Sequence, residues 1–545
     1  MQKGWSKIVN NGTIFGRFRA AAVKWPEKPF LNILPETAAI YGIPAGEITY
    51  LAMLKKVLVR QKALAEAGYG HGTRVGLLLQ NRPEFIEIWF AANSLGASVV
   101  PINPDLRRSE LEYLIEHSEM AAAFVLAGRR AEVAEASLAV GSAMVPITPE
   151  EPVRPLLRKG HVGSGDDAAC EAGLLYTSGT TGSPKGCVLS NEYFLHSGDW
   201  YRDTGGLIAL RLGEERMLTP LPVFHMNAMA VSVIAMVTVG GCLTMLDRFH
   251  PSTWWDSVRQ SRATCVHYLG VMPAMLMKAE PSPQDCDHSL RFGFGAGAPA
   301  ELHGAFEERF GFPLIEAWAM TETGSGGVIS AHREPRKIGT NCFGRPTADV
   351  DIRIVDEAGE DVVGDLPGEL LVRRAGANPR YGFFQSYLKN PEATQEAWQG
   401  GWFHTGDIVS RDADGDLHFV DRKKNVIRRS GENIAAVEVE TILAKHPAIR
   451  QVAVAATPDP VRGDEVAALI VADASTDEEA TAAEIARWSL EEMAYYKVPG
   501  WIGFVTELPR TPTEKILRAA LKELVAERMA AGALHDTRAF KKRKG

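Results

Sequence analysis

The sequence predicts a layered α/β fold: a large N-terminal domain of α/β sheets with a small β subdomain, followed by a small α+β C-terminal domain. Two observations support this prediction. Through the first 340 residues, short apolar runs rich in β-branched residues alternate with longer helical patterns, as in parallel sheets. Near residue 345 the pattern changes to period-two alternation, which is typical of antiparallel strands.

The N-terminal strands are expected where short apolar runs are bounded by turn residues. A helix is expected over 108–117, because its pattern follows an Asn-Pro-Asp turn. The apolar stretch 228–239 holds a Ser and a Thr and is shorter than the roughly 20 residues of a membrane span, so it predicts a core helix. The expected strands are 75–79, 98–102, 122–126, 174–177, 242–246, 264–269 and 313–317.

The C-terminal part of the chain divides into a β subdomain and a separate unit. Alternation over 349–372 predicts antiparallel strands within a β subdomain at about 345–420. The strand expected at 416–421 runs directly into charged residues, which predicts a boundary at 421–424 between an N-terminal domain, 1–420, and a C-terminal domain, 425–545. In the C-terminal domain we expect helices over 437–445 and 483–493 and strands over 451–455 and 467–471.

Length and composition limit the class of protein. The chain has 545 residues, 59 Lys and Arg against 67 Asp and Glu, and a formal net charge of −8. At roughly 150 residues per domain, this length predicts two to four folding units. A mild acidic excess gives no support to a nucleic-acid binder, which normally carries a basic domain or stripe. The basic cluster at 541–544 is expected to be a solvated tail.

The spacing of the cysteines and the N-terminal residues indicate the cellular compartment in which the protein is expected. The six cysteines stand singly, without zinc-ligand spacing, so we expect free, mostly buried thiols in a reducing compartment. Residues 1–11 lack the apolar segment and cleavage site of a secretion signal. These features predict a cytoplasmic protein.

A phosphate-binding function is first indicated by the eleven residues Tyr-Thr-Ser-Gly-Thr-Thr-Gly-Ser-Pro-Lys-Gly, 176–186, which follow an expected strand. Glycine and small hydroxyl residues let the backbone approach a polyphosphate closely, and Lys185 adds positive charge. The loop is not a Walker A motif, because Lys185 precedes Gly186 and is separated from Gly182 by two residues.

This loop resembles the phosphate loop of the AMP-forming adenylating enzymes, the superfamily that includes acyl-CoA synthetases, peptide-synthetase adenylation domains and firefly luciferase. Other motifs of this AMP-dependent synthetase and ligase family follow in the expected order. The residues of these motifs are most similar to those of the crotonobetaine/carnitine-CoA ligase-like branch of the family. The further motifs are Phe224-His-Met-Asn, Gly295-Ala-Gly-Ala-Pro, Trp318-Ala-Met-Thr-Glu-Thr, Gly344-Arg-Pro, Gly401-Trp-Phe-His-Thr-Gly-Asp, Asp421-Arg-Lys-Lys-Asn-Val-Ile-Arg-Arg-Ser-Gly-Glu and Pro509-Arg-Thr-Pro-Thr-Glu-Lys.

The resemblance implies an ATP-dependent carboxylic acid:CoA ligase that uses ATP, Mg²⁺ and coenzyme A. A carboxylate is a poor electrophile, so attack on the α-phosphate of ATP would form an acyl-adenylate and release pyrophosphate before transfer to the CoA thiol. The expected partners are therefore a small carboxylic acid, ATP and CoA, with no nucleic acid and no membrane span. The sequence leaves the oligomeric state open, a homodimer included.

The resemblance also implies a nucleotide site. Trp318 occupies the position of the aromatic residue that stacks on adenine, where family members usually have Tyr or Phe followed by Gly. Asp407 and Arg422 have the chemistry to bind the ribose hydroxyls. The implied nucleotide-binding residues are Thr177, Ser178, Gly179, Thr180, Thr181, Gly182, Lys185, Gly295, Ala296, Gly297, Ala298, Pro299, Glu316, Ala317, Trp318, Thr321, Asp407 and Arg422.

Four residues are implied to be catalytic: Lys515, His225, Thr181 and Glu322. Glu322 and Thr181 would hold Mg²⁺, which binds mainly phosphate oxygens and water. Lys515 would bridge the acyl carboxylate and the ribose side of the nucleotide, although Glu514 precedes it where the family usually has Gly. His225 would gate the acyl pocket or the thiol tunnel.

Thioester formation needs an open path for a thiol at the same carbon. The resemblance implies that a mobile C-terminal domain swings about a hinge at 421–424, with Lys424 as the hinge residue, to exchange the surfaces of the two half-reactions. Ser430, Gly431 and Glu432 would then bind CoA. The implied acyl-pocket residues are Met226, Asn227, Val271 and Met320.

Other functions stay open. One alternative is an adenylating enzyme that loads an acid onto a carrier protein, and another is a non-catalytic nucleotide-binding scaffold. A luciferase-type oxygenase is a minor alternative. Retention of Lys185, Glu322, Asp407, Arg422 and Lys515 argues against the scaffold, because a non-catalytic descendant has no chemical need for all five.

Overall fold

The computed structural model describes residues 12–156, 160, 168–177, 184–422, 426–472, 477–509 and 516–542, without the side chains of residues 421, 422 and 519. The chain forms two compact units. The first draws on Met1–Pro104, Glu116–Leu175 and Gly186–Asp421, and the second on Asp105–Ile115, Tyr176–Lys185 and Arg422–Gly545. Stacked α/β layers confirm the predicted fold class, whereas the domain borders and the hinge stay predictions.

A seven-stranded sheet carries the strands that flank the predicted phosphate loop. Its order is β18-β8-β7-β4-β3-β5-β6, and β3 pairs in parallel with both β4 and β5. The central strands are almost wholly buried, which explains why they form continuous apolar runs instead of alternating ones. The bounds are β3 Arg74–Leu78, β4 Ser98–Pro101, β5 Ala122–Val125, β6 Val145–Ile147, β7 Glu171–Thr177, β8 Lys185–Ser190 and β18 Ser386–Tyr387.

An eight-stranded sheet of the first unit has the order β14-β13-β12-β11-β9-β10-β1-β2. Strands β9, β11, β12 and β13 are parallel neighbours, so their carboxyl ends meet at one edge. The edge strands β2 and β14 run antiparallel to their neighbours, β1 and β13. The bounds are β1 Pro29–Ile33, β2 Gly46–Thr49, β9 Arg216–Thr219, β10 Cys242–Met245, β11 Cys265–Leu269, β12 Phe292–Ala296, β13 Leu314–Trp318 and β14 Ile329–Ser330.

The helices begin at recognisable sequence signals. The side chain of Thr13 accepts a hydrogen bond from Gly16 N at the start of α1, and that of Ser190 accepts one from Tyr193 N at the start of α7. The bounds are α1 Ile14–Lys24, α2 Pro35–Tyr41, α3 Tyr50–Glu66, α4 Pro83–Asn93, α5 Arg108–Ser118, α6 Arg130–Ala139, α7 Asn191–Thr204, α9 Trp254–Ser261, α10 Val271–Leu276, α11 Ala300–Phe310 and α12 Pro391–Ala397.

The stretch predicted as a core helix, 228–239, is fully buried. It begins as a wider π-helical segment, Asn227–Val233, and continues as α8, Ile234–Val239. Single π-helical turns within helices are frequently found at functional sites. This one starts at a predicted acyl-pocket residue, Asn227.

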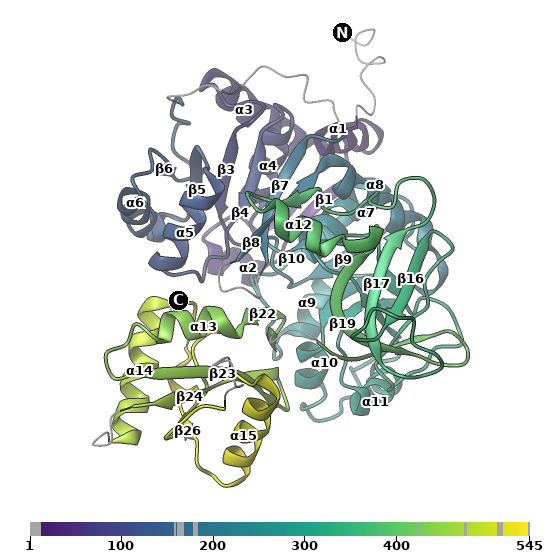
Figure 1. Ribbon diagram of the computed structural model, residues 1–545. Helices are drawn as coiled ribbons and strands as arrows, with labels where there is room; N and C mark the ends of the chain where they lie inside the picture. Colours follow the sequence, from purple (N-terminus) through teal and green to yellow (C-terminus); the bar gives the residue numbers. More distant parts are fainter. Residues whose placement is uncertain are drawn as a thin grey trace. The chain divides into compact units, whose positions relative to one another are not determined.

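A five-stranded antiparallel sheet, with the order β15-β20-β19-β17-β16, forms the predicted β subdomain; β16, β17 and β19 lie side by side in Figure 1. Between β17 and β19 the pairing shifts, because two residues of β17 span the same length as four of β19. The extra residues form a bulge that carries the predicted ribose-binding Asp407. The bounds are β15 Cys342–Gly344, β16 Val350–Val355, β17 Gly368–Arg374, β19 Phe403–Arg411 and β20 Leu417–Arg422.

The second unit is built on a sheet with the order β22-β21-β24-β25-β26, in which β23 also pairs with β24. Its core contains apolar residues from α13, α14 and the long β23–β24 pair. The bounds are β21 Val426–Arg429, β22 Glu432–Ala435, α13 Ala436–Leu443, β23 Gln451–Asp459, β24 Gly463–Val471, α14 Glu478–Glu492, β25 Trp501–Phe504, α15 Arg518–Ala530 and β26 His535–Asp536.

The prediction of a solvated basic tail is wrong for Lys541. Its side chain is buried and forms an ion pair with Glu465, which also accepts from the Arg429 guanidinium at 2.9 Å. Burial, together with the positive charge of Arg429, lowers the pKa of Lys541 to about 7 despite the favourable carboxylate. The tertiary structure therefore anchors the end of the chain through a buried charge cluster.

The cysteines are free, and four of the six are buried, as predicted. Cys170 is partly exposed and Cys286 is exposed. Within the described ranges, none of the helices combines the length and the apolar character that crossing a membrane requires.

Candidate active site

Several of the residues predicted to bind the nucleotide and the acid lie at one edge of the eight-stranded sheet. Four parallel neighbours, β9, β11, β12 and β13, end at this edge, and the predicted residues follow these ends in the chain. The segments concerned are 225–227 after β9, 271 after β11, 297–299 after β12 and 319–322 after β13. Ligands of open α/β sheets bind at the carboxyl ends of the strands, so the topology itself makes this edge a candidate site.

The segment after β12 is held by a buried carboxylate on the next strand. Glu316 accepts hydrogen bonds from Gly297 N at 2.7 Å and Ala298 N at 3.0 Å, and the Tyr268 hydroxyl donates to the same carboxylate. Burial raises the pKa of Glu316. Gly270 lets the segment pack closely, since a Cβ there would lie 1.6 Å from the Gly297 carbonyl oxygen. The segment 297–299, called the Gly297 wall below, is therefore positioned by Glu316, which the sequence only suggests as a nucleotide-binding residue.

The last residue of β13 contacts the β subdomain. The Trp318 indole Nε1–H donates to Asp407 Oδ2 at 2.8 Å, and the ring lies 6.3 Å from that of Phe343. Trp318 is 6% exposed and Asp407 is 2% exposed. Two predicted nucleotide-binding residues, 89 positions apart in the chain, are thus brought into direct contact.

The bulge of β19 determines the backbone position of Asp407. Gly406 takes a positive φ of 69°, and its N–H donates to Glu369 at 3.1 Å. Thr405 donates to the Leu370 carbonyl at 2.6 Å and accepts from Asp407 N at 3.1 Å. These bonds replace the interrupted sheet ladder and explain why the motif needs Thr-Gly before its Asp.

Glu322 lies in the turn after β13 and is 6% exposed. The Tyr387 hydroxyl donates to its Oε1 at 3.0 Å, and Phe384 N donates to its carbonyl at 2.9 Å. The Tyr193 hydroxyl donates to the neighbouring Thr321 carbonyl at 2.8 Å. A buried, oriented carboxylate excludes the simple alternative of a surface Glu and fits a single-carboxylate magnesium ligand.

Of the predicted acyl-pocket residues, Met226, Asn227 and Val271 lie at the start of helical segments, and Met320 lies in the segment after β13. Met226 is buried, while His225 and Met320 are partly exposed. His225 N donates to the Pro222 carbonyl at 3.0 Å and closes the turn that precedes the π-helical segment. Val271 is the first residue of α10.

A buried polar network joins Asn227 to the core, and no motif in the sequence indicates it. His267 is fully buried, and burial lowers its pKa to about 3. Its Nδ1 lies 3.1 Å from Asn227 Oδ1 and 2.8 Å from Ser232 Oγ, and its Nε2 lies 3.2 Å from the Tyr201 hydroxyl. A neutral imidazole that donates from Nδ1 and accepts at Nε2 satisfies these contacts. A lone histidine in an apolar strand is the only sequence signal for this network.

Several predicted residues lie outside the described residues. They are Ser178, Gly179, Thr180, Thr181, Gly182, Lys424 and Lys515, together with the side chain of Arg422. Thr177 ends β7 and Lys185 begins β8, so these two neighbouring strands of the seven-stranded sheet flank the predicted phosphate loop.

In the second unit, the predicted CoA-binding residues form the β21–β22 hairpin. Ser430 and Gly431 both adopt positive φ, 50° and 90°, as a tight two-residue turn requires. Ser430 N donates to the Arg462 carbonyl at 2.9 Å, and Glu432 starts the return strand.

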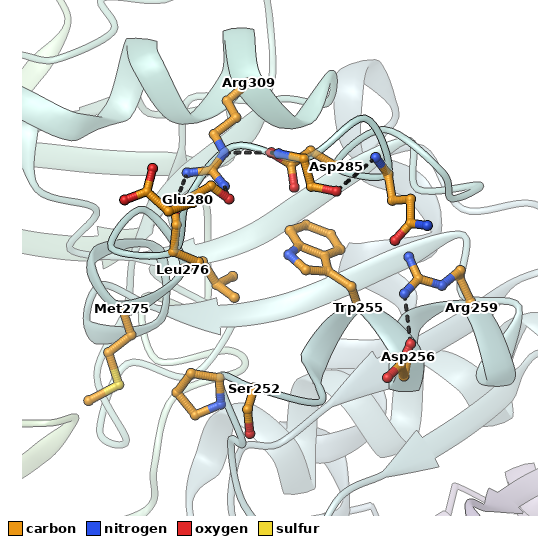
Figure 2. Close-up of a pocket in the computed structure, with 13 residues that line it drawn as sticks. Ser252, Trp255, Asp256, Arg259, Met275, Leu276, Glu280, Asp285 and Arg309 are labelled. Atoms are coloured by element: carbon orange, nitrogen blue, oxygen red, sulfur yellow. Dashed lines mark hydrogen bonds and ion pairs between the residues drawn. The ribbon is translucent and has the colours of Figure 1, made fainter.

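A pocket of about 460 Å³ in the first unit shares no residue with the predicted site (Figure 2). Trp255 lies at the side of the pocket, and four of the charged residues that line it form two ion pairs: Arg309 with Asp285 at 2.7 Å, and Arg259 with Asp256 at 2.7 Å. Across the described ranges, no group of three or more His, Cys, Asp or Glu side chains could hold a metal ion.

Comparison with known proteins identifies the family of the chain. Residues 18–382 match the AMP-binding enzyme family, and residues 438–515 match the AMP-binding enzyme C-terminal domain. The chain is 31% identical over 529 residues to sulfoacetate–CoA ligase of Cupriavidus necator, which covers 93% of this chain and 97% of that protein. It is 29% identical over 513 residues to crotonobetaine/carnitine–CoA ligase of Proteus mirabilis, covering 89% and 96%.

A double mutant of o-succinylbenzoate CoA synthetase from Bacillus subtilis shares the fold, with a TM-score of 0.79 at 24% identity over 93% of this chain and 98% of that one. The resemblance drawn from the motifs is therefore confirmed. The chain belongs to the AMP-binding enzyme family.

Proposed function

We propose that this chain is an AMP-forming carboxylic acid:CoA ligase. The acid's carboxylate attacks the α-phosphate of ATP, and the bond to the leaving pyrophosphate breaks. The CoA thiol then attacks the acyl carbon of the acyl-adenylate and displaces AMP. The observation that carries the proposal is the shared sheet edge, where the Gly297 wall, Trp318 and Glu322 follow adjacent strand ends and Asp407 is hydrogen-bonded to Trp318.

In the first half-reaction, the described residues bind and orient ATP. Asp407 accepts hydrogen bonds from the ribose hydroxyls, and the backbone of the Gly297–Ala298 segment lines the adenine. Glu322, held by Tyr387, is the carboxylate that would hold Mg²⁺ on the phosphates, with Thr181 as a second oxygen ligand. When bound, the ion neutralises phosphate charge.

The remaining phosphate and carboxylate contacts are assigned to loop residues. The hydroxyls and N–H groups of 177–182, together with Lys185, bind the β- and γ-phosphates. Lys515 bridges the acyl carboxylate and the nucleotide, which reduces the repulsion between two negatively charged substrates as they approach. Arg422 binds the ribose beside Asp407.

In the second half-reaction, the C-terminal domain rotates about Lys424 and the β21–β22 hairpin reaches the thiol path. The positive φ values of Ser430 and Gly431 leave backbone groups at the tip of the hairpin, where the pantetheine arm of CoA can approach closely. His225 gates entry to the acyl carbon. Because the two steps are separate, Lys515 can lie beside the acyl carboxylate during adenylation, and the CoA thiol can reach the same acyl carbon afterwards.

We propose a small, polar acid as the substrate class. The two curated relatives are named for sulfoacetate and for crotonobetaine and carnitine, which are all small and charged. In this chain, Asn227 presents an amide at the same edge, backed by the fully buried His267.

The test is pyrophosphate release across a panel of acids, with and without CoA. The panel contains sulfoacetate, crotonobetaine, carnitine, propionate, hexanoate and benzoate. Release with one of the small polar acids, followed by a thioester only when CoA is present, is expected. Release whose product forms only with a carrier protein would favour the carrier-loading alternative, and no release with any acid would refute the ligase.

A further inference from the structure

Stacking on adenine does not account for the hydrogen bond from Trp318 to Asp407. A stacking residue needs only a flat ring, and Tyr or Phe would supply one. Trp318 instead directs its single polar atom, Nε1–H, at a buried carboxylate 2.8 Å away. An indole N–H can donate and cannot accept, so the direction of this bond is settled by chemistry.

We infer that Trp318 is a positioning residue for the nucleotide: its indole N–H orients the Asp407 carboxylate toward the ribose hydroxyls of ATP. This inference rests on the proposed function, because it assumes that Asp407 binds the ribose. It assigns Trp318 a task distinct from stacking on adenine.

The Trp318 contact acts on the carboxylate of Asp407, whereas the bonds of the bulge act on its main chain. The N–H groups of Gly406 and Asp407 donate to Glu369 and Thr405, and neither bond involves the Asp407 carboxylate. The Trp318 N–H fixes one carboxylate oxygen, Oδ2, and thereby the plane of the group. Hydrogen bonds to a charged acceptor in a buried place are strong and short.

The ring of Trp318 is itself immobilised, so it can act as a fixed donor. It ends β13, lies 6.3 Å from the Phe343 ring on β15, and is 6% exposed. A carboxylate oriented before the ligand arrives loses less side-chain freedom on binding. The effect should therefore fall on ATP affinity, and specifically on the part that depends on the ribose hydroxyls.

The test compares ATP with 2′-deoxy-ATP and 3′-deoxy-ATP, measured by isothermal titration calorimetry without acid so that no turnover occurs. The parent is expected to prefer ATP to both analogues. In Trp318→Phe, which keeps an aromatic ring and removes the N–H, ATP should bind about three- to tenfold more weakly. The analogues should lose less, so that the preference for the ribose hydroxyls shrinks.

The matched control is Trp398→Phe. Trp398 is also buried, and its Nε1 has no hydrogen-bond partner among the described residues, so the same chemical change removes no hydrogen bond. This variant should keep the parent's affinities. Asp407→Asn combined with Trp318→Phe should bind ATP no more weakly than Asp407→Asn alone, since Trp318 acts through the carboxylate.

An equal loss of affinity for ATP and both deoxy analogues in Trp318→Phe would overturn the inference and assign the residue to adenine stacking. An unchanged affinity would overturn it as well. A parent that binds no nucleotide would instead refute the proposed function.

A second measurement uses folded parent protein. In a ¹⁵N spectrum of the indole groups, one signal should shift on Asp407→Asn and on ATP binding, and it should be the signal that Trp318→Phe or Trp318→Tyr removes. If no indole signal responds to Asp407→Asn, the inference fails even where the Trp318 variants do not fold.

Discussion

Replacement of Glu316 by Gln should loosen the wall of the nucleotide site while leaving its shape almost unchanged. In the parent, Oε2 accepts from Gly297 N, and Oε1 accepts from Ala298 N and from the Tyr268 hydroxyl. A Gln oxygen placed at the Oε1 position keeps the last two bonds. Its NH₂ group then faces the Gly297 N–H, so two donors meet and a buried N–H loses its acceptor.

The magnitude follows from these contacts. A hydrogen bond to a charged acceptor contributes about 1.5–3 kcal/mol, so the loss of the bond from Gly297 N should lower the free energy of unfolding by about that amount. With roughly 2.1 cal/mol/K of unfolding entropy per residue, over a first unit of about 400 residues, this corresponds to a fall of about 2–4 °C in Tm. The displaced Gly297 should also raise the KM for ATP about three- to tenfold.

Thermal unfolding and the KM for ATP in pyrophosphate release are the two assays. Tyr268→Phe is the companion variant, because it removes one donor to Glu316 and leaves both backbone N–H groups bonded. It should also lower stability by about 1.5–3 kcal/mol, but it should leave the KM unchanged. A Glu316→Gln enzyme with the parent's Tm and KM would refute the reasoning.

The pH dependence offers an independent check on Glu316. Burial raises its pKa in the folded state above the ordinary value of 4.5, so the folded state binds the proton more tightly than the unfolded state does. The contribution of this group to stability is therefore fully present below pH 4.5 and is lost as the pH rises through the raised pKa. Glu316→Gln should lack this decline, as measured by Tm across that pH range.

Three further predictions concern residues of the C-terminal part. Lys515→Ala should slow acyl-adenylate formation in a single turnover by about 10²–10³-fold; a rate equal to the parent's would contradict the role of Lys515. Lys424→Pro should spare adenylation and slow thioester formation from preformed acyl-adenylate, and equal slowing of both steps would count against a hinge. The parent's Tm should rise as the pH increases from about pH 7 toward pH 10.5. Burial lowers the pKa of Lys541 from 10.5 to about 7, so the unfolded state binds the proton more tightly than the folded state in this range. Lys541→Met should remove this rise and leave Glu465 paired with Arg429, and a rise that persists in this variant would exclude Lys541 as its source.

Much of the fold could be predicted from the sequence, because apolar periodicity reports burial directly. The strand expected at 122–126 is Ala122–Val125, and the one expected at 264–269 is Cys265–Leu269. Helix α13, expected at 437–445, is Ala436–Leu443. The π-helical start at Asn227 had no such signal, since a wider turn keeps the same apolar residues buried.

The sequence predicts which residues belong to the site, but it does not predict their contacts. Motif order identified the family, and the roles that the resemblance implies for Trp318, Glu322 and Asp407 stay predictions. Only the structure shows that Trp318 donates to Asp407 and that Glu316 holds the neighbouring wall.

The sequence by itself therefore determined the layered α/β class, the approximate strand positions and the family, because periodicity and motif order are properties of short stretches of chain. The tertiary structure decided which polar groups satisfy one another: Trp318 with Asp407 across 89 residues, and Lys541 with Glu465 across 76. The physical reason is that a buried donor or charge must find a partner, and the partners that lie close by are set by how strands from distant parts of the chain pack together.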